Sequence, residues 1–421
     1  MISTTTPRLD RSALIDWYRR NRERSAQIFA LVDDDAFMLR PISLRHPFVF
    51  YEGHLPAFSF LTLNERALRE DPIDPVLEKL FERGIDPDSL DAAKAHQRAD
   101  WPSRSHIEQF GRACDARVID ALQHAKLVDP ANPRLWRGQS VFTVLEHEPM
   151  HHETLMYIIH QLDFAHKGRI AQQHYDHTPP ENPMQRVHAG TAHLGADPEA
   201  VTFGWDNEFR ALDVEVAAFS ISRYPVTNGD WLRYVKEGGP VPVFWIERDG
   251  EFFLRGVFEE LPLPRSWPVY VSHDQAAAYA RWAGMRLPTE AEFHRAAYGT
   301  PDGPDRMYPW GSDSPDALHG NFDFARFDPE PVDAHPAGAS AWEIEDLVGN
   351  GWEWTSSVFE PFPGFEPMAS YPQYSADFFD GRHYVMKGAS PVTARELIRP
   401  SFRNWFYSDY PYMYAKFRCV T

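Results

Sequence analysis

The stretch Glu146-His-Glu-Pro-Met-His-His-Glu153 places two histidines, His147 and His151, four residues apart. It lies within residues 141–162, where apolar side chains recur every three or four positions and predict an amphipathic helix. Side chains four residues apart on a helix project from the same face. Because two neutral imidazoles on one face chelate a divalent metal well, the stretch predicts one side of a metal site.

A third ligand has to come from another part of the chain, and His54 is the candidate. It stands in Phe50-Tyr-Glu-Gly-His-Leu-Pro-Ala-Phe58, among apolar and aromatic residues that predict burial. A buried histidine in such surroundings needs a polar or metal partner. Pro149 opposes a regular helix around the histidine pair, since proline lacks the N–H that a helix interior uses. We therefore expect the helix to start close to Pro149 or to bend there.

Other interpretations of the pair stay open at this point. The same letters spell His147-Glu148-x-x-His151, the zinc-hydrolase signature in which Glu148 would be the general base. Proline between the histidines and the lack of a His-x-x-Gly-x-x-His extension count against that interpretation. The histidines could also be ordinary side chains of a helical bundle, in a protein that binds a small molecule without catalysis.

The two halves of the chain differ in texture. Helical periodicity recurs through the first 170 residues and predicts an antiparallel bundle. The predicted helices are 12 to beyond 29, 61–68, 75–83, 107–125 and 141–162. Residues 172–186 are polar and proline-containing, as in a linker. Beyond them only 274–283 and 289–298 predict helices, and the rest predicts short strands and long loops. We expect an α+β protein with domains at 1–171 and 187–421.

Composition narrows the class of protein. The 421 residues are 43% hydrophobic and 24% charged, as in globular proteins. A net charge of −19 argues against a nucleic-acid partner, whose phosphates would be repelled. Cys114 and Cys419 are the only cysteines, too few for a disulfide framework. No apolar run has the length of a signal peptide or a membrane span, so we expect a cytoplasmic protein without a membrane partner.

Motifs in the second half carry a family resemblance. They are Gly284-Met-Arg-Leu-Pro-Thr-Glu-Ala-Glu-Phe293, Tyr308-Pro-Trp-Gly311, Gly320-Asn321, Asp346-Leu-Val-Gly-Asn-Gly-Trp-Glu-Trp-Thr355, Phe402-Arg-Asn-Trp405 and Phe417-Arg-Cys419. In this order they resemble the formylglycine-generating-enzyme fold, a C-type-lectin-like domain. Formylglycine generation itself uses a pair of cysteines, and this half has only Cys419. The helical half resembles a DinB-type bundle. Together the halves resemble the sulfoxide synthases of ergothioneine biosynthesis and their relatives, including selenoneine synthase.

This resemblance implies a non-haem iron(II) site formed by His54, His147 and His151. It also implies oxidative coupling of hercynine, the trimethylated betaine of histidine, to a sulfur or selenium donor, with dioxygen as the oxidant. Such an iron leaves positions open for substrate and oxygen. By position in the family motifs, Tyr371 would deliver a proton or hydrogen, and Tyr374 would orient the imidazole of hercynine.

Other positions bear on how hercynine and the donor are bound. Asn404, Trp405 and Phe406 match the place where the family holds the quaternary ammonium, which aromatic faces bind well. Relatives that use γ-glutamylcysteine carry Gln at the substrate-contacting position of Met150 and Asp at that of Phe406. The resemblance therefore implies cysteine or a selenium donor such as a selenosugar. Arg98 and Arg104 lie where relatives place arginines that bind the donor.

Overall fold

The computed structural model describes residues 9–82 and 100–421. They form two compact units. One unit comprises Met1–Ile170 together with the short segment Met368–Pro372, and the other comprises Ala171–Pro367 and Gln373–Thr421. The first is helical and the second mixes strands with helices, so the predicted α+β class is confirmed. No helix in the described part of the chain is long and apolar enough to cross a membrane.

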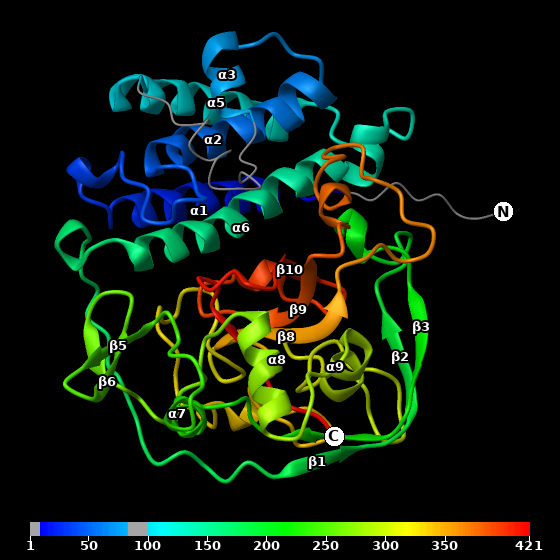
Figure 1. Cartoon of the computed structure of the whole chain (residues 1–421). Helices are drawn as coiled ribbons and strands as arrows, with labels where there is room; N and C mark the ends of the chain where they lie inside the picture. The colour runs from blue at the N-terminus through cyan, green and yellow to red at the C-terminus, as the bar shows by residue number, and fades with distance from the viewer. Residues whose placement is uncertain (1–8, 83–99) are drawn as a thin grey trace. The chain divides into compact units, whose positions relative to one another are not determined.

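Five α-helices build the described part of the first unit (Figure 1). They are α1 (Arg11–Phe29), α2 (Phe48–Phe60), α3 (Pro75–Phe81), α5 (Arg104–His124) and α6 (Gln139–Gln161). Helix α6 packs on α1 and α2, and α2 also packs on α3 and α5. Four of these helices were predicted from periodicity and are confirmed with slightly shifted ends.

Helix α2 is the exception, and it corrects the prediction for residues 61–68. That stretch is a π-helical continuation of α2, Leu61–Ala67, rather than a helix of its own. Along α2 every residue except Glu52 is buried. A helix that is buried on all sides has no polar stripe, so its sequence shows no amphipathic period.

Helix α6 runs through Pro149, and the expectation that it would start there is wrong. The ring of Pro149 leaves the carbonyl of Leu145, four residues earlier, without its usual N–H donor. The side chain of Asn21 on α1 supplies the replacement, because its Nδ2 donates to Leu145 O at 2.8 Å. Both residues are buried, so this hydrogen bond satisfies a carbonyl that water does not reach.

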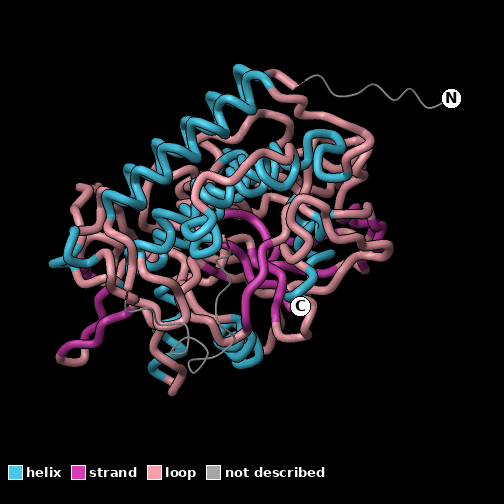
Figure 2. The backbone as a smooth tube through the Cα atoms, turned by 90° about the horizontal axis from the view of Figure 1, so that it is seen from above, coloured by secondary structure: helices cyan, strands magenta, loops and turns pink. Residues whose placement is uncertain are grey.

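The second unit is made of short strands joined by long loops, drawn in pink in Figure 2. Its largest sheet has the strand order β10-β9-β8-β11 and is antiparallel except for the parallel pair β8 and β11. These strands are β8 (Gly351–Val358), β9 (His383–Ala389), β10 (Asn404–Tyr407) and β11 (Ala415–Lys416).

Smaller sheets accompany it. Strand β1 (Met184–Val187) pairs with β4 (Phe219–Ser222), and β2 (Gly190–Leu194) pairs with β3 (Leu212–Val216). A third sheet joins β5 (Trp245–Arg248), β6 (Glu251–Arg255) and β7 (Glu260–Pro262). Within the predicted linker, Tyr175 and Asp176 accept hydrogen bonds from Trp267 and Ser266, so that stretch is tied to the second unit.

Three α-helices complete the described part of this unit: α7 (Asn228–Lys236), α8 (His273–Trp282) and α9 (Glu290–Ala297). The predictions for α8 and α9 are confirmed, whereas α7 was missed. A capping box opens α7, with the Thr227 hydroxyl accepting from the Asp230 N–H and the Asp230 carboxylate accepting from the Thr227 N–H. That Thr-x-x-Asp pattern was the available sequence signal.

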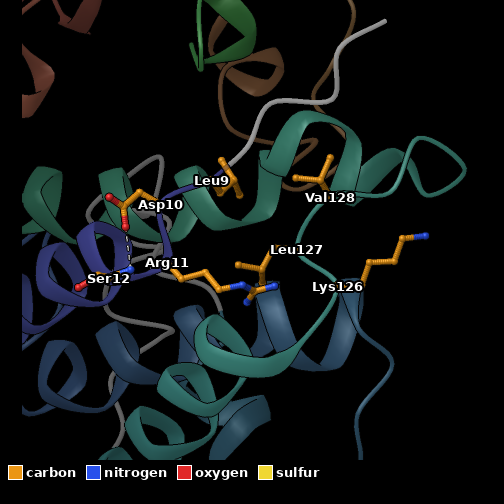
Figure 3. A pocket seen from close by; sticks show the side chains of 7 residues that line it. All are labelled: Leu9, Asp10, Arg11, Ser12, Lys126, Leu127 and Val128. Carbon is orange, nitrogen blue, oxygen red and sulfur yellow. Dashed lines mark hydrogen bonds between the residues drawn. The ribbon is translucent and has the colours of Figure 1, made fainter.

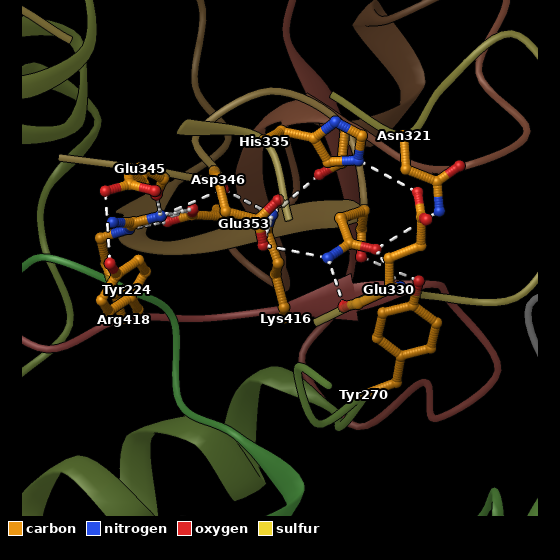
Figure 4. A network of polar contacts seen from close by, with 12 residues as sticks. Tyr224, Tyr270, Asn321, Glu330, His335, Glu345, Asp346, Glu353, Lys416 and Arg418 are labelled. Atoms are coloured by element: carbon orange, nitrogen blue, oxygen red, sulfur yellow. Dashed lines mark hydrogen bonds and ion pairs between the residues drawn. The ribbon is translucent and has the colours of Figure 1, made fainter. Parts of the chain in front are cut away.

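Two of the family motifs meet in a buried network of charges (Figure 4). Arg418 is fully buried against Glu353, with Nε 2.7 Å from Oε2. Lys416 donates to Gly349 O at 2.8 Å and pairs with Asp346 at 2.9 Å. Because buried charges are tolerated only when paired, these contacts fix the end of the chain and the loop before β8 in place. The motifs around these residues are therefore structural.

Candidate metal centre

Three histidines meet inside the helical unit. Helix α2 supplies His54, and α6 supplies His147 and His151. One ring nitrogen from each lies within 4.8 Å of the other two. The ring centres of His147 and His151 are 5.3 and 5.0 Å from that of His54, and the Nε2 atoms of the α6 pair are 3.1 Å apart. The structure thus brings together all three predicted ligands.

The orientation of His54 is set by its backbone neighbour. Its Nδ1 lies 2.7 Å from the carbonyl of Phe81, and a carbonyl only accepts, so Nδ1 carries the proton. Such an outer hydrogen bond fixes the tautomer of a ligating histidine and leaves the Nε2 lone pair available. Gly53 makes room for this arrangement, because a Cβ there would lie 2.4 Å from the Phe81 ring.

The cluster has the properties that a cation site requires. His54 Nε2 is buried without a hydrogen-bond partner among residues 9–82 and 100–421, and the Nε2 atoms of His147 and His151 have only each other. Burial lowers the pKa of His54 to about 4, and burial followed by the charges of neighbouring histidines holds the pKa of His147 and of His151 well below the usual value. All three imidazoles are neutral at neutral pH, as ligation requires. This donor set fits divalent metals that favour imidazole, iron(II) and zinc among them.

Aromatic rings hold the histidines. Phe58 stacks on His147, with ring centres 3.4 Å apart and planes at 9°. Phe50 stacks on His54 at 5.1 Å and 17°. Since Phe50, His54 and Phe58 follow one another at intervals of four residues, one stripe of α2 supplies both a candidate ligand and its supports.

Glu148 lies on another side of α6. Consecutive helical residues are about 100° apart, so Glu148 does not share the direction of His147. Its carboxylate accepts from Arg22 at 2.7 Å and from Ser25 at 2.5 Å, both on α1. Burial would raise its pKa, but the charge of Arg22 and hydrogen bonds from His152 and Ser25 lower it to about 2. A carboxylate of such low basicity, engaged with α1, is poorly suited to be a general base.

Tyr371 lies beside the histidines. It belongs to the segment Met368–Pro372 of the helical unit. Its half-buried ring is 6.2 Å from the ring of His147 and 5.2 Å from that of Phe58. Met150, half-buried on α6, stands in the chain between His147 and His151. The predicted catalytic tyrosine is therefore a neighbour of the proposed ligands.

The second unit contains an aromatic cluster around Trp405. Tyr374 lies edge-on to Trp405 at 5.3 Å and stacks on Trp205 at 3.9 Å, while Phe359 stacks on Trp405 at 4.2 Å. Sequence reasoning missed Trp205. It directly precedes the buried turn Asp206–Glu208, where neither helical nor strand periodicity gives a signal.

The other residues of β10 are arranged differently. Asn404 accepts a hydrogen bond from the N–H of Trp405 at 2.9 Å. Phe406 packs on Tyr410, with ring centres 5.0 Å apart. Neighbouring residues of a strand point to opposite faces, so Phe406 lies apart from the cluster that surrounds Trp405.

Arg98 and Arg104 are the two arginines predicted to bind the donor. Arg98 lies outside the described residues. Arg104 pairs with Glu52 at 3.0 Å and with Asp34, and its guanidinium lies 3.7 Å above the ring of Phe37. Two carboxylates thus balance its charge, and a role in donor binding stays a prediction.

A surface hollow elsewhere in the helical unit contains none of the predicted site residues (Figure 3). It lies at the start of α1, where Asp10 caps the helix and Arg11 donates to the carbonyls of Leu122 and Ala125. The polar groups seen there hold α1 against the end of α5. The residues that line it are Leu9, Asp10, Arg11, Ser12, Lys126, Leu127 and Val128.

Comparison with known proteins gives concordant matches. Residues 171–421 match the FGE-sulfatase family, described as "Sulfatase-modifying factor enzyme 1-like domain". The chain is 34% identical to "Hercynine oxygenase" of Mycolicibacterium thermoresistibile, covering 90% of this chain and 88% of that protein. It is 32% identical to "Hercynine oxygenase" of Mycolicibacterium smegmatis, covering 95% and 96%. "Ergothioneine biosynthesis protein 1" of Neurospora crassa is 28% identical, over 93% of this chain and 55% of that protein.

Among solved structures, PvdO from Pseudomonas aeruginosa is 21% identical, with a TM-score of 0.43, and the match covers 58% of this chain and 98% of that chain.

Proposed function

The chain belongs to the hercynine oxygenase family and is therefore an oxidoreductase, and on that premise we propose that it joins the imidazole ring of hercynine to sulfur or selenium, using iron(II) and dioxygen. The observation that carries the proposal is the cluster of His54, His147 and His151, in which three neutral imidazoles converge within 4.8 Å. The similarity to hercynine oxygenases supports hercynine as the substrate, and the histidine cluster supports a metal-binding site.

In this proposal the three histidines hold iron(II). When bound, the metal supplies the redox chemistry and open coordination positions for dioxygen and the donor. Tyr371 supplies a proton or hydrogen from its hydroxyl, which its closeness to the His147 ring supports. Phe50 and Phe58 keep the imidazoles in place and exclude water from their faces.

The aromatic cluster of the second unit is proposed to bind hercynine. The trimethylammonium group of hercynine cannot donate hydrogen bonds and is best held by aromatic faces. Trp405, Tyr374 and Trp205 form a continuous group of rings that offers such faces. Asn404 and Phe406 flank Trp405 on β10 and point to the opposite face of that strand, so they are proposed to bind substrate there, apart from the aromatic cluster. Tyr374 is proposed to orient the imidazole.

The donor is proposed to be cysteine or a selenium compound such as a selenosugar. Met150 and Phe406 present a thioether and a phenyl ring where relatives that use γ-glutamylcysteine carry an amide and a carboxylate. An apolar side chain cannot pair with the polar γ-glutamyl group, so a donor without that group is favoured.

A competition experiment tests the proposal. Iron(II)-reconstituted protein receives hercynine and oxygen with equimolar cysteine, γ-glutamylcysteine and a selenosugar, while oxygen uptake is recorded and products are identified by mass. We expect hercynine-dependent oxygen uptake and a product with a new carbon–sulfur or carbon–selenium bond. Zinc-loaded protein and His147→Ala are the controls and should form no product. The absence of hercynine-dependent oxygen uptake with every donor refutes the proposed function.

A further inference from the structure

One face of α6 contains four polar residues at regular intervals: Gln139, Thr143, His147 and His151. Each step of four residues turns the direction by only about 40° and rises by about 6 Å, so the four side chains form a continuous stripe. His147 and His151 are the proposed metal ligands. Thr143 and Gln139, one and two turns before His147, contact a segment from much later in the chain.

That segment is tied to α6 through Ser370. The N–H of Ser370 donates to Gln139 Oε1 at 3.0 Å. Its hydroxyl shares a hydrogen bond with the hydroxyl of Thr143 at 2.8 Å, and both side chains are buried. The N–H of Tyr371 donates to the carbonyl of Met368 at 3.2 Å, which closes the segment into a turn. Ser370 is thus held by its backbone and by its side chain.

We propose that Gln139 and Thr143 are positioning residues, which hold Ser370 and thereby set the height of Tyr371 along the helix that carries His147 and His151. The inference rests on the proposed function, because it assigns Tyr371 a part in the reaction. The same helix then fixes both the metal ligands and the tyrosine. Since a misplacement of about 1 Å costs up to about a hundredfold in rate, hydrogen bonds at this distance from the metal matter for turnover.

Substitution at Thr143 tests the inference by turnover. Thr143→Val keeps the shape of the side chain and removes the hydroxyl, whereas Thr143→Ser keeps it. We expect Thr143→Val to lower kcat about ten- to a hundredfold, with the KM for hercynine and the iron(II) dissociation constant within about twofold of wild type. Thr143→Ser should recover most of the rate. Thr154→Val is the matched control on α6, because the Thr154 hydroxyl bonds the Met150 carbonyl of its own helix.

A double-mutant cycle with Tyr371→Phe separates positioning from a general effect on folding. If Thr143 acts through Tyr371, Thr143→Val causes little further loss in the Tyr371→Phe background. Losses that multiply, or an iron(II) affinity that falls in parallel with kcat, overturn the inference.

Hydrogen exchange provides a measurement that does not need turnover. In peptides covering residues 365–375, Gln139→Leu should speed exchange about tenfold, because the Ser370 N–H loses its acceptor, while Gln139→Glu keeps an acceptor oxygen and should preserve the protection. Unchanged exchange in Gln139→Leu refutes the attachment itself. The expected exchange in a protein without hercynine-dependent oxygen uptake leaves the attachment standing and refutes the proposed function.

Discussion

The hydrogen bond from Asn21 to Leu145 explains how a proline is accommodated between two proposed ligands, and its removal gives a quantitative prediction. Asn21 and Leu145 are buried, and Pro149 has no N–H with which to serve the carbonyl of Leu145. Asn21→Leu removes the amide donor and keeps a side chain of similar size. The carbonyl is then left inside the protein without a partner, since water does not reach it.

The expected cost follows from that unpaired carbonyl. Leaving a buried acceptor unsatisfied costs about 1–3 kcal/mol, and we expect Asn21→Leu to lower the free energy of unfolding by about 2 kcal/mol. Pro149→Ala restores an N–H four residues after Leu145. In that background the carbonyl has a partner within the helix, so Asn21→Leu should cost well under about 1 kcal/mol.

Urea unfolding of the full chain, followed by circular dichroism at 222 nm, measures these four proteins, because the helices of the first unit dominate that signal. We expect a coupling free energy of about 1 kcal/mol or more between positions 21 and 149. If the two substitutions add to within about 0.5 kcal/mol, the amide does not substitute for the missing N–H and the reasoning is refuted.

Three further outcomes follow from the structure. Glu148→Gln weakens a buried ion pair with Arg22, so the free energy of unfolding should fall by up to about 3 kcal/mol. The rate of hercynine-dependent oxygen uptake per folded molecule should stay within about tenfold of wild type. A loss above a thousandfold would return Glu148 to the role of base. Trp405→Leu should raise the KM for hercynine about 5- to 30-fold through the lost cation–π contact, with unchanged iron(II) affinity, and an unchanged KM contradicts this. Burial of His335 lowers its pKa, but the hydrogen bond and charge of Glu330 outweigh burial and raise it. The difference in unfolding free energy between wild type and His335→Gln should therefore be largest below about pH 6.5 and shrink as pH rises through the raised pKa. Urea unfolding from pH 5 to 9 measures this difference, and a difference that grows with pH contradicts the prediction.

Much of the helical unit could be predicted from sequence because its helices are amphipathic. The interval between His147 and His151 and the apolar setting of His54 identified the three histidines that the fold brings together. Helix α2 was not predicted, because nearly all its residues are buried and its sequence has no period. Likewise, nothing in the sequence near Pro149 predicts the hydrogen bond from Asn21 to Leu145, because the two residues are 124 positions apart.

Contacts between distant parts of the chain account for the rest. Thr143 and Ser370 are 227 residues apart, and nothing in the sequence around either residue indicates that they pair. Trp205 stacks on Tyr374 from the position before the short turn Asp206–Glu208, where periodicity offers no signal. Side-chain pairing of this kind depends on the tertiary path of the chain, so residue types and spacing alone do not reveal it.

The spelling His147-Glu148-x-x-His151 shows why a motif needs its surroundings. In the hydrolase interpretation the glutamate between the histidines must face the metal with a usable basicity. Here Glu148 faces α1, because the step of about 100° from His147 directs it there and Arg22 with Ser25 occupies its carboxylate. What faces the cluster instead is Tyr371, which is held by Ser370 on the stripe that continues from Gln139 and Thr143. The sequence of residues 146–153 therefore does not by itself decide between hydrolysis and oxidation. That choice depends on the residues that pack on each side of the helix.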